Sequence, residues 1–237
     1  GTDAVRYWAA CGRPGVDTAF DEGQMKIGRK LATKLLNASK FVLNFGTPAA
    51  GAEASAPIDL AMLARLDGVI ADATAAFDSF DYARALEVVE TFFWWFCDDY
   101  VELVKGRAYN GQGEAARDSA LAALRIALHS VHRLFAPFLP FVTDEVWNWW
   151  QQGSVHRQQW PTAAGISADD RLLDPVCEVL AAVRRAKTEA KASQKAVVES
   201  LEVRGGSAWV SITNTGERAG SHLVQLYGGS VNSPADG

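Results

Sequence analysis

The chain has 237 residues, of which 49% are hydrophobic, so it can bury a sizeable core. Its formal net charge is −5, which means that a polyanionic partner would have to bind at a local basic surface. No apolar run is long enough to span a membrane, the N-terminus does not have the pattern of a signal peptide, and Cys11, Cys97 and Cys177 form no CxxC pair. We therefore expect neither a membrane protein nor a disulfide-stabilised secreted domain.

The first predicted elements are a short helix over 3–11 and a long amphipathic helix over 21–45. Asp21 and Glu22 stand at the start of the long helix, where its dipole favours acidic side chains, and Gly46 ends it. The apolar residues of the long helix recur in steps of three and four, at Ile27, Leu31, Leu35, Ala38, Val42 and Phe45. This pattern predicts one continuous buried stripe.

Three further amphipathic helices follow the flexible connection 46–57. The second has its apolar face between Met62 and Phe77, the third extends from the capping loop 78–82 to about Arg107, and the fourth ends near Phe135. The apolar face of the third helix comprises Leu86, Val89, Phe93, Phe96, Tyr100 and Leu103. Because each stripe can be buried only against the others, the sequence predicts a mainly α fold built on a helical bundle.

Pro137 and Pro140 are predicted to end the fourth helix, because proline lacks the amide proton that a helix needs. Thr143 is expected to cap the next helix, and the tryptophans that follow, Trp147, Trp149 and Trp150, to close one end of the bundle.

A last long helix is predicted over 170–195, followed by a strand over 197–204 and a strand pair over 207–229. The fold class is therefore a helical bundle followed by a long helix and a small C-terminal β segment. The expected domains are residues 1–20 as the end of a preceding region, 21–162 as the bundle, 163–206 as a junction and 207–237 as an atypical β tail.

The polar face of the long first helix is cationic. A sector of about 80° carries Lys26, Lys30, Thr33, Asn37, Lys40 and Asn44, with Arg29 at its edge. The last helix gathers Arg184, Lys187, Lys191 and Lys195 in the same way, with Arg185 beside them. Such stripes can bind phosphate backbones, but a polar helix face is often merely solvated, and spacing alone does not decide between these interpretations.

No catalytic constellation is predicted. His129 and His132 lie three residues apart on a helix, but no Cys, Asp or Glu accompanies them at ligand spacing, so we expect an interhelical polar contact or a solvated site and no metal. The sequence contains no GxSxG, GxxxxGK[ST] or GxGxxG motif.

Several blocks of the sequence resemble the valyl-tRNA synthetases, a family of class I aminoacyl-tRNA synthetases. They are "TAFDEGQMKIGRKLATKLLNASKFVL", "FDYARALEVVETFFWWFCDDYVELVKGRAY", "LHSVHRLFAPFLPFVTDEVW" and "SVHRQQWP", and the resemblance covers roughly residues 3–204. It implies a helical anticodon-binding domain whose partner is valine tRNA.

The resemblance also implies a binding site. Arg29 and Lys40 would contact tRNA phosphates or anticodon bases, Val101 and Glu102 would line the same pocket, and Arg107 is a further candidate. The cationic stripe adds Lys26, Lys30 and Asn37 to these candidates, and Arg184 with Arg185 matches the junction toward the family's C-terminal coiled coil.

The chain departs from the family in what it lacks. The HIGH and KMSKS signatures of the nucleotide-binding fold are absent, so the chain alone is expected to bind no cofactor and to be inactive, whereas the intact enzyme would use ATP with Mg. The chain opens on Gly1, so we expect it to begin inside a larger protein. We further expect a monomeric, cytoplasmic protein without a membrane partner.

The tail over 207–229 instead resembles the fibronectin-type module of bacterial β-glucosidases. A lone strand pair is marginally stable, so we expect it to be poorly packed or to pair with residues 197–204. Two alternative functions remain open: a helical protein–protein interaction scaffold with no nucleic-acid role, and a segment accessory to a carbohydrate enzyme.

Overall fold

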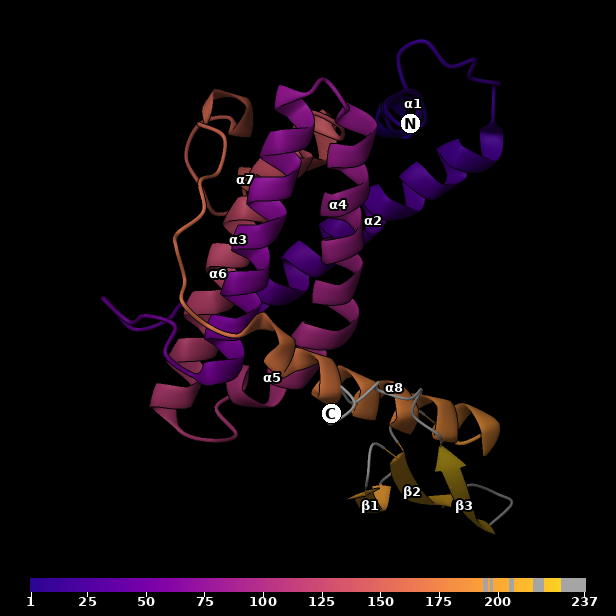
Figure 1. Ribbon diagram of the computed structural model, residues 1–237. Helices are drawn as coiled ribbons and strands as arrows, with labels where there is room; N and C mark the ends of the chain where they lie inside the picture. The colour runs from indigo at the N-terminus through magenta and orange to yellow at the C-terminus, as the bar shows by residue number, and fades with distance from the viewer. Residues whose placement is uncertain (194–195, 197, 205–206, 215–219, 227–237) are drawn as a thin grey trace, which may run out of the picture. The chain divides into compact units, whose positions relative to one another are not determined.

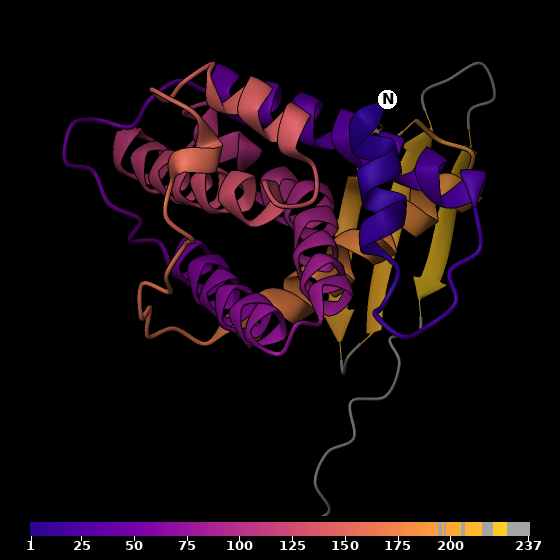
Figure 2. The same ribbon diagram turned by 90° about the horizontal axis from the view of Figure 1, so that it is seen from above.

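The computed structural model describes residues 1–193, 196, 198–204, 207–214 and 220–226. The chain divides into two compact units, Gly1–Asp170 and Arg171–Gly237. The first unit is helical (Figures 1 and 2). The predicted mainly α bundle is confirmed. None of the helices in the described part of the chain combines the length and the apolar character that crossing a membrane requires.

Helices α1 (Thr2–Ala10) and α2 (Glu22–Asn44) pack against each other. Asp21 caps α2 as expected, because its carboxylate accepts hydrogen bonds from the backbone N–H groups of Gly23 and Gln24 at 2.7 and 3.3 Å. In Figure 1, α2 crosses behind α3 (Pro57–Asp78) and α4 (Tyr82–Trp95).

The buried face of α2 differs from the predicted one at its N-terminal end. Leu31, Leu35 and Val42 are buried as predicted, but Ile27 is 41% exposed. Gly28 is buried in its place, because α1 approaches so closely that a Cβ at this position would lie 2.5 Å from Cβ of Tyr7. The contact between α1 and Gly28 therefore sets the orientation of this end of α2. Hydrophobic periodicity does not predict such a contact, because glycine has no side chain.

The body of the bundle consists of α3, α4 and α6 (Glu114–Phe135), which lie side by side in both views (Figures 1 and 2). Asp81 caps α4 by accepting a hydrogen bond from the N–H of Arg84 at 3.0 Å. Aromatic residues fill the space between helices, as where the rings of Phe93 and Phe135 meet edge to face at 5.4 Å.

The predicted third helix is interrupted by a π-helical turn. Phe96–Tyr100 forms this turn between α4 and α5 (Val101–Ala108), so the helix to Arg107 is continuous but not uniform. Leu103, which was expected in the core, is only half-buried, and Val104 is fully buried in its place.

Helix α7 (Pro140–Trp147) begins four residues earlier than predicted, with Leu139 as its N-cap, so the assignment of Thr143 as the N-cap is wrong. Pro140 occupies the first turn, where its missing N–H has no cost and its fixed φ suits a helix. Thr143 is buried inside the helix, and its hydroxyl donates to the carbonyl of Leu139 at 2.8 Å. Trp147 is buried against His129, whereas Trp149 remains exposed, so only part of the aromatic surface closes the bundle.

The 3-10 turn Val155–Arg157 follows α7, and Asp170–Leu172 forms another before α8 (Leu173–Glu189). In the second unit α8 packs on β2, and Ala186 is its buried centre. The helix ends at Glu189 and not at 195, because Lys191 adopts a positive φ of 50° and the N–H of Ala192 bonds back to the carbonyl of Lys187 at 2.9 Å.

Strands β1 (Val198–Arg204), β2 (Ser207–Asn214) and β3 (Gly220–Leu226) form an antiparallel sheet in the order β1-β2-β3. Residues 207–214 thus pair with residues 198–204. Lys195 and the tail residues 215–219 and 227–237 lie outside the described residues.

Candidate nucleic-acid interface

The predicted cationic face of α2 is open to solvent. Every residue assigned to this stripe is exposed: Lys26, Arg29, Lys30, Thr33, Asn37, Lys40 and Asn44. Lys40 lies fourteen positions after Lys26, and at 1.5 Å per residue the stripe follows the helix for about 21 Å. Within the described residues no ion pair engages its lysines or Arg29, so their charges face water.

A shallow groove of about 530 Å³ extends along this face. It is lined by Lys26, Arg29, Lys30, Thr33, Lys34, Asn37 and, from α4, Trp94. Lys34 differs from the stripe residues, because its Nζ lies 2.8 Å from a carboxylate oxygen of Asp98 and 5.5 Å from the ring centroid of Trp94. The side of the groove next to α4 is therefore formed by Trp94 and by Lys34, whose charge Asp98 neutralises. On the other side, Lys26, Arg29 and Lys30 keep their positive charges exposed.

Two of the residues carried over from the family resemblance, Val101 and Arg107, are buried in this structure. Val101 is only 4% exposed, because it faces the core at the start of α5, so its side chain offers little surface to a ligand, and its place in the pocket stays a prediction. Glu102, the next residue, is exposed and pairs with Lys105 one turn further along the helix.

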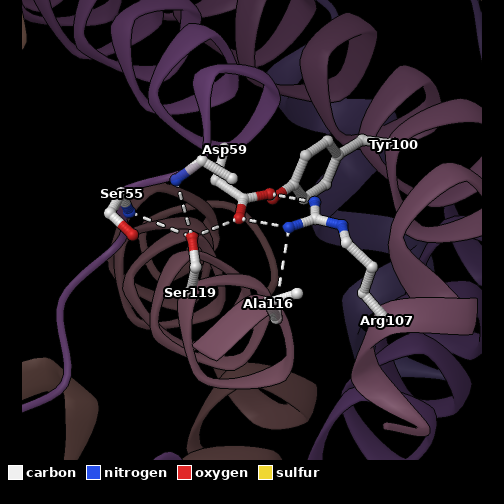
Figure 3. Close-up of polar contacts among 7 residues, drawn as sticks. Ser55, Asp59, Tyr100, Arg107, Ala116 and Ser119 are labelled. Atoms are coloured by element: carbon white, nitrogen blue, oxygen red, sulfur yellow. Dashed lines mark hydrogen bonds and ion pairs between the residues drawn. The ribbon is translucent and has the colours of Figure 1, made fainter. Parts of the chain in front are cut away.

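The guanidinium of Arg107 is buried in an ion pair with Asp59 (Figure 3), which gives this residue a structural role. Asp59 is fully buried at the start of α3 and accepts four hydrogen bonds. They come from Tyr100 Oη at 2.7 Å, Arg107 Nη1 at 2.9 Å, Arg107 Nη2 at 2.6 Å and Ser119 Oγ at 2.6 Å. This saturates the carboxylate, which offers about four lone-pair sites.

The same network fixes the start of α3. Ser119 Oγ accepts hydrogen bonds from the backbone N–H groups of Ser55 and Ala56, both at 2.9 Å, so a side chain of α6 satisfies donors that precede α3 (Figure 3). Burial, together with the charge of Asp59 and the hydrogen bond to it, raises the pKa of Tyr100, so its phenol remains a donor. The hydrogen bond to Asp59 raises the pKa of Arg107. The network is structural, since it ties α3, the π turn, α5 and α6 together.

One of the two histidines of α6, His132, forms an interhelical polar contact, which was one of the two predicted outcomes, whereas the ring of His129 packs on Trp147. Nε2 of His132 lies 2.8 Å from the hydroxyl of Ser39 on α2. Because Ser39 gives its only proton to the carbonyl of Leu35 at 2.7 Å, Nε2 is the donor. Burial, with the nearby His129, lowers the pKa of His132 to about 3. Among the described residues, no group of three or more His, Cys, Asp or Glu side chains could hold a metal ion.

On α8, in the second unit, Arg185 is exposed and Arg184 is half-buried. Sequence analysis did not assign Trp94 or Lys34 to the site, but both line the groove on α2. Their part in it depends on α4 lying beside the polar face of α2, which the periodicity of either helix alone does not indicate.

Residues 59–203 match the family described as the anticodon-binding domain of tRNA ligase. The chain belongs to this family. The resemblance to valyl-tRNA synthetases is confirmed by curated relatives that are valine–tRNA ligases. The one from Salinispora tropica is 53% identical over 228 residues, covering 86% of this chain and 26% of the relative. The one from Thermobifida fusca is 56% identical over 215 residues, covering 87% and 24%.

The chain thus spans about a quarter of the length of these curated relatives. Among solved structures, the crystal structure of the ternary complex of LeuRS, tRNA and LeuAMS from Agrobacterium radiobacter K84 is similar with a TM-score of 0.53. The match covers 86% of this chain and 27% of that chain, at 14% sequence identity, and so shows the fold alone. Helix α2 precedes the family match at residue 59, so the role of its stripe depends on the geometry described above.

Proposed function

We propose that the chain is the tRNA-binding, anticodon-recognising part of a valine–tRNA ligase. The observation that supports this proposal best is the open cationic face of α2, with its groove, in a member of the anticodon-binding family. An acidic protein can bind RNA only where its positive charges gather, and the exposed face of α2 is one place where they do.

The proposed interface separates phosphate contacts from base contacts. Lys26, Arg29, Lys30 and Lys40 carry the charge that neutralises phosphates, and neutralisation supplies affinity without sequence information. The Asn37 amide and the exposed Glu102 carboxylate offer hydrogen-bonding groups to the edges of unpaired bases. Discrimination between valine tRNA and other tRNAs would therefore depend on the anticodon loop, where bases are not paired.

In the intact protein we infer that valine is joined to its tRNA at the expense of ATP, in the cytoplasm, by a catalytic domain outside this chain. The chain contributes binding and positioning, because contacts far from the reacting atoms can hold a substrate in a productive orientation. ATP with Mg would be held by that other domain.

The test is equilibrium binding of the 237-residue chain to a valine tRNA transcript and to transcripts with altered anticodons. Arg29→Ala and Lys40→Ala each remove a charge-assisted contact, so each should weaken binding roughly tenfold or more. Arg157→Ala, which removes an exposed charge on another element, is the matched control and should leave affinity unchanged.

Absence of measurable affinity for any tRNA would contradict the proposal and favour the alternative of a helical protein–protein interaction scaffold. Equal losses in Lys40→Ala and Arg157→Ala would also contradict it, because binding would then depend on total charge and not on α2.

A further inference from the structure

An exposed aromatic surface adjoins the C-terminal end of the cationic stripe. We call Phe41, Phe45 and Tyr109 the aromatic step. Phe45 is buried in the middle, with its ring centroid 4.9 Å from that of Phe41 and 4.8 Å from that of Tyr109, both edge to face. The outer rings are open, Phe41 at 38% and Tyr109 at 66% exposure. The step therefore joins α2 to the turn that follows α5.

The backbone that carries Tyr109 is held firmly. The N–H of Asn110 bonds to the carbonyl of Arg107 at 2.8 Å, and the N–H of Gly111 bonds to the carbonyl of Gly106 at 2.9 Å. With Asn110 at a φ of 67°, these bonds form the closed turn that typically ends a helix. A Cβ at position 111 would lie 2.8 Å from the Gly106 oxygen, so the turn needs glycine there.

Arg107 strengthens this support, because its guanidinium is fixed on Asp59 only two residues before Tyr109. The ring of Tyr109 is thus held by its edge-to-face contact with Phe45 and by the hydrogen-bonded turn that carries it. A braced ring with most of its surface in water loses little conformational freedom when a flat ligand stacks on it.

The polar surroundings of the step indicate the chemistry of that ligand. Lys40 and Asn44 are exposed on α2 beside Phe41, and Lys105 lies one helical turn before Tyr109 on the same side of α5. Lys40 and Asn44 can donate hydrogen bonds to an anion, whereas Lys105 is paired with Glu102. An apolar peptide would leave such donors unsatisfied, whereas a nucleotide presents both a π face for the ring and a phosphate for the lysine.

We propose that Tyr109 is a stacking platform for an unpaired nucleotide of the tRNA, whose backbone is held by Lys40. This inference rests on the proposed function and adds to it a contact that depends on the flat ring, not on charge. Aromatic stacking is tolerant of base identity, so Tyr109 would contribute affinity and orientation, while discrimination comes from the polar groups around it.

The test compares Tyr109→Trp, Tyr109→Leu and Tyr109→Ala in the 237-residue chain. Leu keeps apolar contact with Phe45 but offers no ring, so Leu and Ala should both weaken binding of valine tRNA roughly tenfold to a hundredfold, and Trp should retain it. Single 2-aminopurines placed in the anticodon loop report stacking directly. At one position the fluorescence should be quenched on binding to wild type and Tyr109→Trp, and not on binding to Tyr109→Leu.

The possible failures are distinguishable. If wild type binds tRNA and Lys40→Ala weakens binding, but Tyr109→Leu binds normally with unchanged quenching, the stacking proposal is overturned and the proposed function stands. If wild type has no affinity for tRNA, both fail. Matching thermal unfolding of wild type and Tyr109→Leu would show that a loss of affinity arises at the ring and not from a disturbed turn.

Discussion

Replacing Arg107 by methionine tests the structural role that the fold assigns to this residue. Methionine approximates the length of the arginine stem but removes the positive charge and two of the four hydrogen bonds that Asp59 accepts, those at 2.9 and 2.6 Å. Asp59 has no exposed surface, so water cannot replace the lost donors. The substitution therefore leaves a buried carboxylate without its counter-charge.

The expected cost in the free energy of unfolding is about 3–5 kcal/mol, the range typical of breaking one side of a buried ion pair. Two charge-assisted hydrogen bonds at about 1.5–3 kcal/mol each lead to a similar figure. Since domains are stable by about 5–15 kcal/mol, Arg107→Met should remove a large fraction of the total. Urea denaturation followed by far-ultraviolet circular dichroism measures this loss as a shift of the midpoint.

Two further variants sharpen this test. Arg84→Met removes an exposed arginine that pairs with exposed Glu87, and it should change stability by less than about 0.5 kcal/mol. Asp59→Asn combined with Arg107→Met removes the buried charge and should recover part of the loss. A cost of under about 1 kcal/mol for Arg107→Met would refute the reasoning, because the guanidinium would then not be what stabilises Asp59.

Three further predictions concern other parts of the first unit. Gly28→Ala places a Cβ 2.5 Å from that of Tyr7, so it should destabilise the chain by about 1–3 kcal/mol in urea denaturation. Burial lowers the pKa of His132 to about 3, below its unfolded value of about 6.5, so the unfolded state binds more protons between these values and stability falls as pH falls. The loss from this group should reach about 2 kcal/mol at pH 5, and His132→Gln should lack it. Cys97, whose pKa burial raises to about 12, should resist iodoacetamide until the chain unfolds, as mass spectrometry would show.

Each of these predictions has a control or a contradicting result. Gly68→Ala adds a Cβ to α3 in open space, so it should stabilise by up to about 1 kcal/mol through helix propensity, and equal effects at both glycines would contradict the packing argument. Parallel stability curves for wild type and His132→Gln between pH 7 and 5 would show that His132 does not titrate as described. Rapid alkylation of Cys97 in the folded chain would contradict its burial.

Local and periodic features could be predicted from the sequence. The start of α2 follows from Asp21, whose side chain caps the helix without help from the rest of the fold. The exposed stripe follows from the spacing of residues such as Lys26 and Lys40, because helical geometry alone places them on one face. The bundle follows from the apolar stripes that had to be covered.

Features that depend on distant residues could not be predicted in the same way. Arg107 follows Leu103 by four residues and so continues the spacing of the predicted buried face, but only the folded chain brings Asp59, 48 residues earlier, to its guanidinium. Tyr109 carries no signal until Phe45 is known to lie behind it. Thr143 failed as a cap for a local reason, since Pro140 offered a competing helix start three residues earlier.

The most direct test of the central claim is the salt dependence of tRNA binding. The logarithm of the association constant should fall linearly with the logarithm of salt concentration, with a slope that counts the phosphates neutralised. Replacing Lys26, Arg29, Lys30 and Lys40 by alanine should reduce that slope by roughly 0.7–1 for each contact removed, whereas Arg84→Ala with Arg157→Ala should not change it. An unchanged slope in the fourfold variant would contradict the claim that α2 binds the tRNA backbone.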